Sequence, residues 1–133
     1  ATWDTLKLPD KYDSAIMFKH GSELFLIARR HPGKRKFDHY QSHTKNLVMY
    51  SLSAKRTAVY HIDTQNKRVR WLFDLPGRGD TAFAGIAQWP GQPNTYQIMN
   101  YTNDPKGRDR WWLKGQLTPS MIYHLQLTIT PTD

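Results

Sequence analysis

The spacing of the turns constrains the fold of this chain more than any other feature of its sequence. Apolar residues alternate with polar ones or run in short β-branched and aromatic stretches, and Gly, Pro, Asn and Asp separate the stretches. Such patterns are typical of strands, and helical periodicity is scarce. The sequence therefore predicts an all-β chain. The candidate strands are Trp3–Leu8, Ala15–Phe18, Glu23–Arg30, Thr57–Ile62, Arg68–Phe73, Ala82–Trp89, Thr95–Tyr101 and Met121–Ile129.

Two segments remain outside this pattern. Leu47–Leu52 is apolar enough for a strand or a turn of helix, and we place it in a loop. No helix is expected elsewhere, and the segment least unsuited to one is Pro119–Tyr123.

The links between the strands fall into two classes of length. Successive connections of an up-and-down sheet alternate between its two ends. The sequence thus predicts one plain end and one elaborated end, and loops on a rigid scaffold commonly carry function. The short links, with Gly, Asp, Asn or Pro as hairpins require, are His20–Ser22, Asp63–Lys67 and Pro90–Asn94. The long ones are His31–Arg56, Asp74–Thr81 and Thr102–Ser120.

Composition narrows the class of protein. A chain of 133 residues with 38% hydrophobic and 13% aromatic residues is expected to form one ordered domain, 1–133. No apolar run approaches the roughly 18 to 20 residues that cross a bilayer, so we expect no membrane span. The 19 Lys and Arg residues exceed the 11 Asp and Glu residues, and the net charge of +8 favours anionic partners: nucleic acid, acidic glycans or carboxylated substrates.

The residues that are missing also exclude some chemistry. Cysteine is absent, which excludes disulfides, thiolate metal sites and Cys nucleophiles. The sequence starts at Ala1 without a basic segment followed by an apolar one, so any signal peptide or initiator Met is expected to have been removed.

The candidate strands form two meanders. The strands that start near residues 15, 23, 57 and 68 make a complete set of four, and those near 82, 95 and 121 lack one strand, which Trp3–Leu8 is suited to supply. Repeated four-stranded meanders are the units of a β-propeller. The segments Thr57–Ile62 and Ser120–Leu125 have similar patterns, TAVYHI and SMIYHL, which supports an internal repeat.

Several sequence segments resemble those of a known protein family. The segments Trp71–Phe83, Leu24–Arg30 and Asn100–Thr102, with Ile122 and Tyr123, resemble two consecutive blades of sialidase-like β-propellers over roughly residues 12 to 128. The resemblance implies one blade over about 12–75 and a second over about 80–130 plus 1–8. Arg78 replaces a Gly of the family phrase, and Ala84 stands where Pro is common.

The resemblance also limits the chemistry that one chain can perform. The family's catalytic site gathers three arginines, an acid and a Tyr with its Glu from six blades, whereas this chain supplies two. Glu23 is the only Glu in the chain and lies beside a hairpin turn, so a Tyr/Glu couple within one chain is not expected. We therefore expect either part of a longer protein or a homo-oligomeric ring.

The candidate ligand-binding residues lie on the elaborated end. They are Arg29, Arg30, Arg78, Asp80, Tyr101 and Trp111. Adjacent strand residues point to opposite faces, so one of Arg29 and Arg30 should face the site while the other pairs with a carboxylate. Asp80 should lie within about 10 Å of the inward arginine and be bridged to it, because buried polar groups need partners.

Each of these residues has a structural interpretation as well. Asp80 is equally suited to capping a turn, and the two arginines to surface or structural roles. Trp111 is suited to stacking on a sugar ring, and alternatively Trp111 and Trp112 fold back as a lid or bury a subunit contact.

The link 31–56 is strongly basic and contains aromatic residues. This combination suits nucleic acid, and a solvated loop explains it equally well. We expect this link to be the most mobile part of the chain. His39 and His43 have helical spacing for a metal pair, but no third ligand is near, so neither a metal nor a cofactor is expected.

The sequence favours a carbohydrate-related ligand-binding module or fragment, with a glycan or another anionic ligand as its partner. One alternative is a glycoside hydrolase half-site completed by assembly. Another is a basic β-barrel or sandwich that binds nucleic acid. We expect Trp3–Leu8 to pair with the strand Met121–Ile129, within the chain or between copies, most naturally in a trimer.

Overall fold

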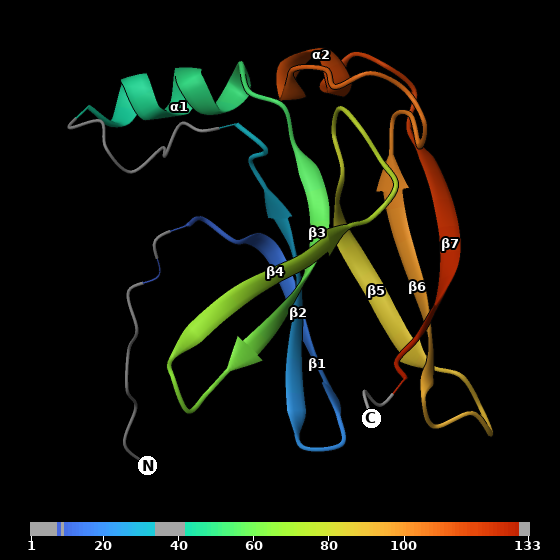
Figure 1. The fold of residues 1–133 in the computed structure, drawn as a ribbon. Coiled ribbons are helices and arrows are strands. Elements are labelled where there is room, and N and C mark those ends of the chain that lie inside the picture. Colours follow the sequence, from blue (N-terminus) through green and yellow to red (C-terminus); the bar gives the residue numbers. More distant parts are fainter. Residues whose placement is uncertain (1–7, 9, 34–41, 131–133) are drawn as a thin grey trace.

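The computed structural model describes residues 8, 10–33 and 42–130 and contains two antiparallel sheets (Figure 1). The first has the order β1-β2-β3-β4 and the second the order β5-β6-β7. The prediction of an all-β chain is confirmed in part, because the fold is mainly β but contains two short helices, and the two sheets are open meanders. The strands are β1 (Asp13–His20), β2 (Glu23–Arg30), β3 (Arg56–Asp63), β4 (Arg68–Asp74), β5 (Ala82–Gln88), β6 (Thr95–Thr102) and β7 (Met121–Thr128).

Every predicted strand from Ala15 onward corresponds to an observed one, with ends shifted by up to two residues. The predicted strand Trp3–Leu8 lies outside the described residues except for Leu8, which is not in a strand.

Two short helices occur where the sequence predicted loops. Helix α1 covers His43–Ser51, so the prediction of a loop at Leu47–Leu52 is wrong for most of that segment. The Ser42 side chain caps α1 by accepting a hydrogen bond from the Lys45 backbone N–H at 3.4 Å. Helix α2 covers Trp112–Gln116, so the expectation that this link holds no helix is wrong, and the segment Pro119–Tyr123 runs into β7, which begins at Met121. Neither described helix is long and apolar enough to span a membrane.

The two ends of the molecule differ as predicted. Figure 1 shows the three hairpin turns at one end of the strands, and α1, α2 and the long links at the other. We call the latter the link end.

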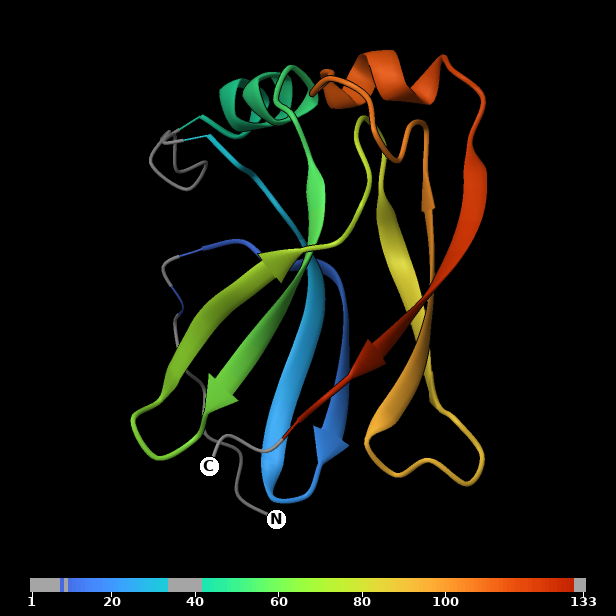
Figure 2. The same ribbon diagram turned by 45° about the vertical axis from the view of Figure 1, so that its right-hand side comes forward.

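An apolar core joins the two sheets. Ile27 and Val59 from the first sheet meet Ala84 and Ile98 from the second, and all four are buried. In Figure 2 the sheets lie face to face, with β5 beside the first sheet. The opposite face of the first sheet carries a separate cluster of Leu26, Ala28, Ala58 and Tyr60.

The first strand of each sheet contains the same irregularity. In β1 the pairing with β2 shifts between Asp13 and Ile16, and in β5 the pairing with β6 shifts between Ala82 and Gly85. The bulges hold two non-glycine residues at positive φ, Ser14 at 51° and Phe83 at 53°.

This shared bulge fixes which residues of the two sheets are equivalent. Asp13 pairs with Arg29 before the first bulge, and Ala82 pairs with Tyr101 before the second. Arg29 and Tyr101 therefore occupy the same position in their sheets. Thr57 pairs with Arg29 and Ile122 with Tyr101, so the repeat aligns Thr57 with Ile122. The sequence match instead aligned Thr57 with Ser120, two residues before Ile122. Because side chains alternate along a strand, a shift of two residues leaves each side chain on the same face.

Candidate functional site

Arg29 lies between the sheets at the link end and forms a buried ion pair with Asp80. Its Nη2 is 3.2 Å from Asp80 Oδ1, and its Nε donates to the Thr81 carbonyl at 3.1 Å. The predicted proximity of Asp80 to an inward arginine is confirmed, and Arg29 is the inward one. Arg29 shares its face of β2 with the core residue Ile27, which explains why it is buried.

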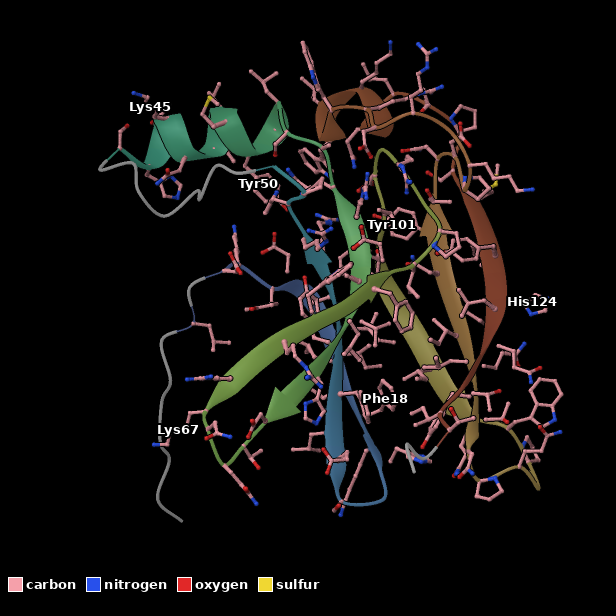
Figure 3. All side chains as sticks on the ribbon, in the orientation of Figure 1. Phe18, Lys45, Tyr50, Lys67, Tyr101 and His124 are labelled. Atoms are coloured by element: carbon pink, nitrogen blue, oxygen red, sulfur yellow. The ribbon has the colours of Figure 1, made fainter. Side chains whose placement is uncertain are left out.

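Two tyrosines complete the coordination of Arg29. Its Nη1 donates to Tyr50 Oη at 2.9 Å, and its Nη2 lies 3.5 Å from Tyr101 Oη. Tyr50 in turn donates to Asp13 at 2.8 Å. Figure 3 shows Tyr50 on the strand side of α1 and Tyr101 at the link end of the sheets. Every nitrogen of the guanidinium thus has a protein partner.

Asp80 is held by α2 as well as by Arg29. Trp112 Nε1 donates to Oδ1 at 2.8 Å, and Gln116 Nε2 donates to Oδ2 at 2.5 Å. A Cβ at Gly115 would clash with the Asp80 backbone N, so this position of α2 requires glycine. The carboxylate therefore acts as an acceptor that fastens α2 over the gap between the sheets.

Lys55 and His31 lie beside this cluster. Lys55 is completely buried, donates to the Tyr50 carbonyl at 2.5 Å and to Ser53, and lies 3.9 Å from the centre of the Tyr50 ring. Burial, and then the positive charge of Arg29, lower the pKa of Lys55 to about 7. Burial and the neighbouring cations Lys55, Lys11 and Arg29 lower the pKa of His31 to about 3, so its ring is neutral near neutral pH.

Arg30 and Arg78 belong to a different cluster. Arg30 makes two hydrogen bonds to Asp74, at 2.6 and 2.9 Å, so the predicted pairing of the outward arginine with a carboxylate is confirmed. Arg56 joins Asp74 to Asp109 at 2.8 and 2.7 Å, and Arg78 is 3.2 Å from Asp109. The structure therefore separates Arg30 and Arg78 from Arg29 and Asp80.

Of the two adjacent tryptophans, the one that reaches the cluster is Trp112. The Trp111 side chain is 60% exposed, and its backbone forms a bridge to Ala54. Trp112 packs edge-on against Tyr50, with ring centroids 5.7 Å apart. Of the two roles considered for these tryptophans, folding back as a lid fits Trp112, whereas Trp111 is exposed on the surface.

Sequence reasoning did not find Tyr50, Lys55 or Gln116. Tyr50 lies on a helix that was predicted to be a loop, and Gln116 lies on a helix that was not expected. One sequence feature could have indicated this second helix: Trp112 and Gln116 are four residues apart, a spacing that places both on one side of a helix.

Phe83 is the most unusual surface residue near the cluster. Its backbone has a φ of 53°, its side chain is 71% exposed, and its ring stacks on that of Tyr101 with centroids 6.3 Å apart and an interplanar angle of 18°. Burial, and then the hydrogen bond and charge of Asp80, raise the pKa of Tyr101 to about 12. The pair therefore offers an apolar ring face beside a hydroxyl that stays protonated.

The polar cluster is closed, and its accessible part is the Phe83–Tyr101 pair. Arg29 and Asp80 are buried and fully coordinated, so they hold Tyr101 and α2 in place. Within residues 8, 10–33 and 42–130, no three side chains of the kinds that bind metals gather as a metal ion requires.

The chain was compared with protein-family models, curated proteins and solved structures, and it matches none of them.

Proposed function

We propose that this chain is a pair of propeller-type blades of the sialidase-like kind and binds a carbohydrate-related ligand that carries an anionic group. The ligand stacks on the rings of Phe83 and Tyr101 at the link end. The resemblance of the segments 24–30 and 71–83 supports the family, and the shared bulge of β1 and β5 supports two equivalent blades.

The strained, exposed Phe83 carries the functional part of the proposal. A non-glycine residue at positive φ is destabilising by about 1 to 3 kcal/mol, and such conformations cluster at binding sites. An exposed aromatic ring also forgoes the free energy that its burial would contribute to folding. Here the strain presents a flat apolar ring beside the Tyr101 hydroxyl, the arrangement on which the C–H face of a sugar stacks.

The charge of the chain selects the class of sugar. A net charge of +8 raises the local concentration of anionic ligands over neutral ones. Arg29 Nη2 lies 3.5 Å from the Tyr101 hydroxyl, so a guanidinium group stands behind the ring pair, where it is also paired with Asp80.

The alignment of the two sheets by their bulges predicts how one copy of the chain would stack on another. Within the chain, the Ile27 face of the first sheet packs on the Ile98 face of the second. The repeat makes Leu26 equivalent to Ile98, and Ile27 equivalent to Met99. The outward face of the first sheet and the outward face of the second are thus equivalent to the two faces that meet inside the chain, and a head-to-tail neighbour would repeat that contact. Tyr101 shares the outward face of β6 with Met99, so such a neighbour and the ligand compete for this face.

The outward face of the first sheet has the apolar character that this stacking requires. It carries an apolar groove of about 400 Å³ lined by Tyr12, Met17, Leu26, Ile62 and Val69 among others. The outward face of the second sheet presents Met99, which is 52% exposed.

Titration of the protein with sialyllactose and with lactose, followed by calorimetry, tests the binding proposal. The acidic sugar should bind more tightly, and Phe83→Ala should weaken that binding at least tenfold because the stacking ring is lost. Phe83→Tyr is the matched control, since it keeps the aromatic ring and should keep the affinity. Equal affinity of the wild type and Phe83→Ala, or no binding of either sugar, would reject the site.

A further inference from the structure

A second surface lies on α1 and α2, away from the sheet faces. The two helices lie across the link end of the molecule in both Figure 1 and Figure 2. The Trp112 backbone N–H donates to the Ser53 carbonyl at 3.0 Å, and the Ala54–Trp111 bridge also joins the two segments. We call this surface the helical end, and these backbone contacts join its two helices directly.

The helical end exposes large apolar side chains. Leu117 is 83% exposed, and Val48 on α1 and Leu52, which follows the last residue of α1, are also exposed. A folded chain rarely leaves apolar residues together on one surface unless that surface binds something. The exposed apolar residues of the helical end are Leu47, Val48, Leu52, Trp111, Leu113 and Leu117.

Helix α1 lacks the burial that normally stabilises a short helix. It has nine residues, none of them buried, and is attached to the strands through Tyr50. Isolated helices shorter than about 12 to 15 residues are marginal in water. A surface that covers Val48 and Leu52 would supply the missing burial.

The charge of the helical end identifies the kind of surface it fits. The segments 43–52 and 110–118 contain Lys45, Arg110 and Lys114 and no acidic residue. The nearest acid along the chain, Asp109, is paired with Arg56 and Arg78. Aliphatic side chains with a Trp and three basic residues suit a lipid headgroup region, whereas nucleic acid is bound chiefly through stacked aromatic rings and phosphates.

We propose that the helical end docks on the surface of an anionic lipid bilayer. Trp111, Leu113 and Leu117 enter the headgroup region, and Arg110 and Lys114 neutralise lipid charge. The Phe83–Tyr101 pair lies on a sheet face, so this docking does not depend on the proposed sugar site.

Cosedimentation with vesicles tests the proposal. The protein should bind vesicles of phosphatidylcholine with about 30% phosphatidylserine at least tenfold more tightly than pure phosphatidylcholine, since each basic residue near the surface contributes. The double variant Leu113→Gln/Leu117→Gln should lose most of this binding, and Lys114→Glu should weaken it about fivefold or more.

The matched control is Ile122→Gln, which removes an apolar side chain whose exposure lies between those of Leu113 and Leu117 but which belongs to β7, outside the helical end. It should leave vesicle binding unchanged. Thermal unfolding of each variant checks that the fold is kept. Absence of vesicle binding by the wild type, or equal losses in Ile122→Gln and the double variant, would overturn the proposal. So would binding to an oligonucleotide that depends on Lys114 and not on the leucines, because that result would assign the surface to nucleic acid.

Discussion

Arg29 and Arg30 show how strongly one position along a strand changes the role of a residue. They are adjacent on β2, yet Arg29 is buried against Asp80 between the sheets and Arg30 pairs with Asp74 on the other face. The alternation of side chains along a strand accounts for this difference. Both arginines have raised pKa values and remain charged, so each ion pair persists across the physiological range.

Lys55 is expected to make stability depend on pH. Its pKa is about 7 in the folded protein, whereas an unfolded lysine has its ordinary value of 10.5, so the folded state binds fewer protons between these values. The free energy of unfolding should therefore rise between about pH 7 and pH 9, by about 1 to 2 kcal/mol. His31 also makes the free energy of unfolding rise with pH, but this increase ends near the ordinary histidine pKa of 6.5, below the window in which Lys55 titrates.

Urea denaturation at several pH values, with Lys55→Met as the comparison, measures this effect. The variant should be nearly flat over the same window, because methionine does not titrate. A flat profile for the wild type would show that Lys55 keeps its proton when buried.

The strands follow from local sequence patterns, whereas the helices depend on contacts with the rest of the molecule. Helix α2 has five residues and is attached through Trp112 and Gln116 to Asp80, which lies more than thirty positions earlier in the sequence. Helix α1 is attached through Tyr50 to Arg29 and Asp13. One buried ion pair therefore organises both helices.

The two adjacent tryptophans provide a matched test of this attachment. Trp112→Phe removes an indole N–H donor to the buried Asp80 carboxylate and should lower the free energy of unfolding by about 1 to 3 kcal/mol. Trp111→Phe changes an exposed ring and should stay within about 0.5 kcal/mol of the wild type. Chemical denaturation of both variants checks the difference, and equal values would mean that the bond from Trp112 to Asp80 does not hold α2.

In the molecule as a whole, two antiparallel sheets share one core, and the other face of each sheet is turned outward. Ile98 and Met99 are neighbours on β6, and the first is buried in the core while the second is 52% exposed on the outward face. Substitution of Ile98 should therefore change the stability of the fold, and substitution of Met99 should change association between copies.

Sedimentation of the wild type and of two variants tests this division. The wild type should sediment above the monomer mass of 15.6 kDa as its concentration rises. Met99→Glu should return it to a monomer with an unchanged melting temperature, because a charge on the outward face opposes stacking. Ile98→Ala should instead destabilise the fold by about 2 to 5 kcal/mol through the cavity it leaves. A wild type that stays monomeric at all concentrations would contradict head-to-tail stacking.

Much of the architecture could be derived from sequence because it depends on local rules. Alternating apolar residues located the strands from β1 to β7, and the lengths of the links predicted which end would be elaborated. The same alternation separated Arg29 from Arg30. These features need only the two-residue period of a strand and the geometry of hairpins.

The remaining features depend on which distant residues meet when the sheets pack. Nothing local to Trp112 distinguishes it from Trp111 until Asp80 is placed beneath α2, and nothing local to Lys55 indicates complete burial. When the bulges of β1 and β5 are aligned, Thr57 of β3 corresponds to Ile122 of β7, two residues from the sequence match of Thr57 with Ser120, because this correspondence depends on how β3 pairs with β2 and β7 with β6. Burial, coordination and register are properties of pairs of segments far apart in the chain, so they emerge only when the two sheets close over a common core.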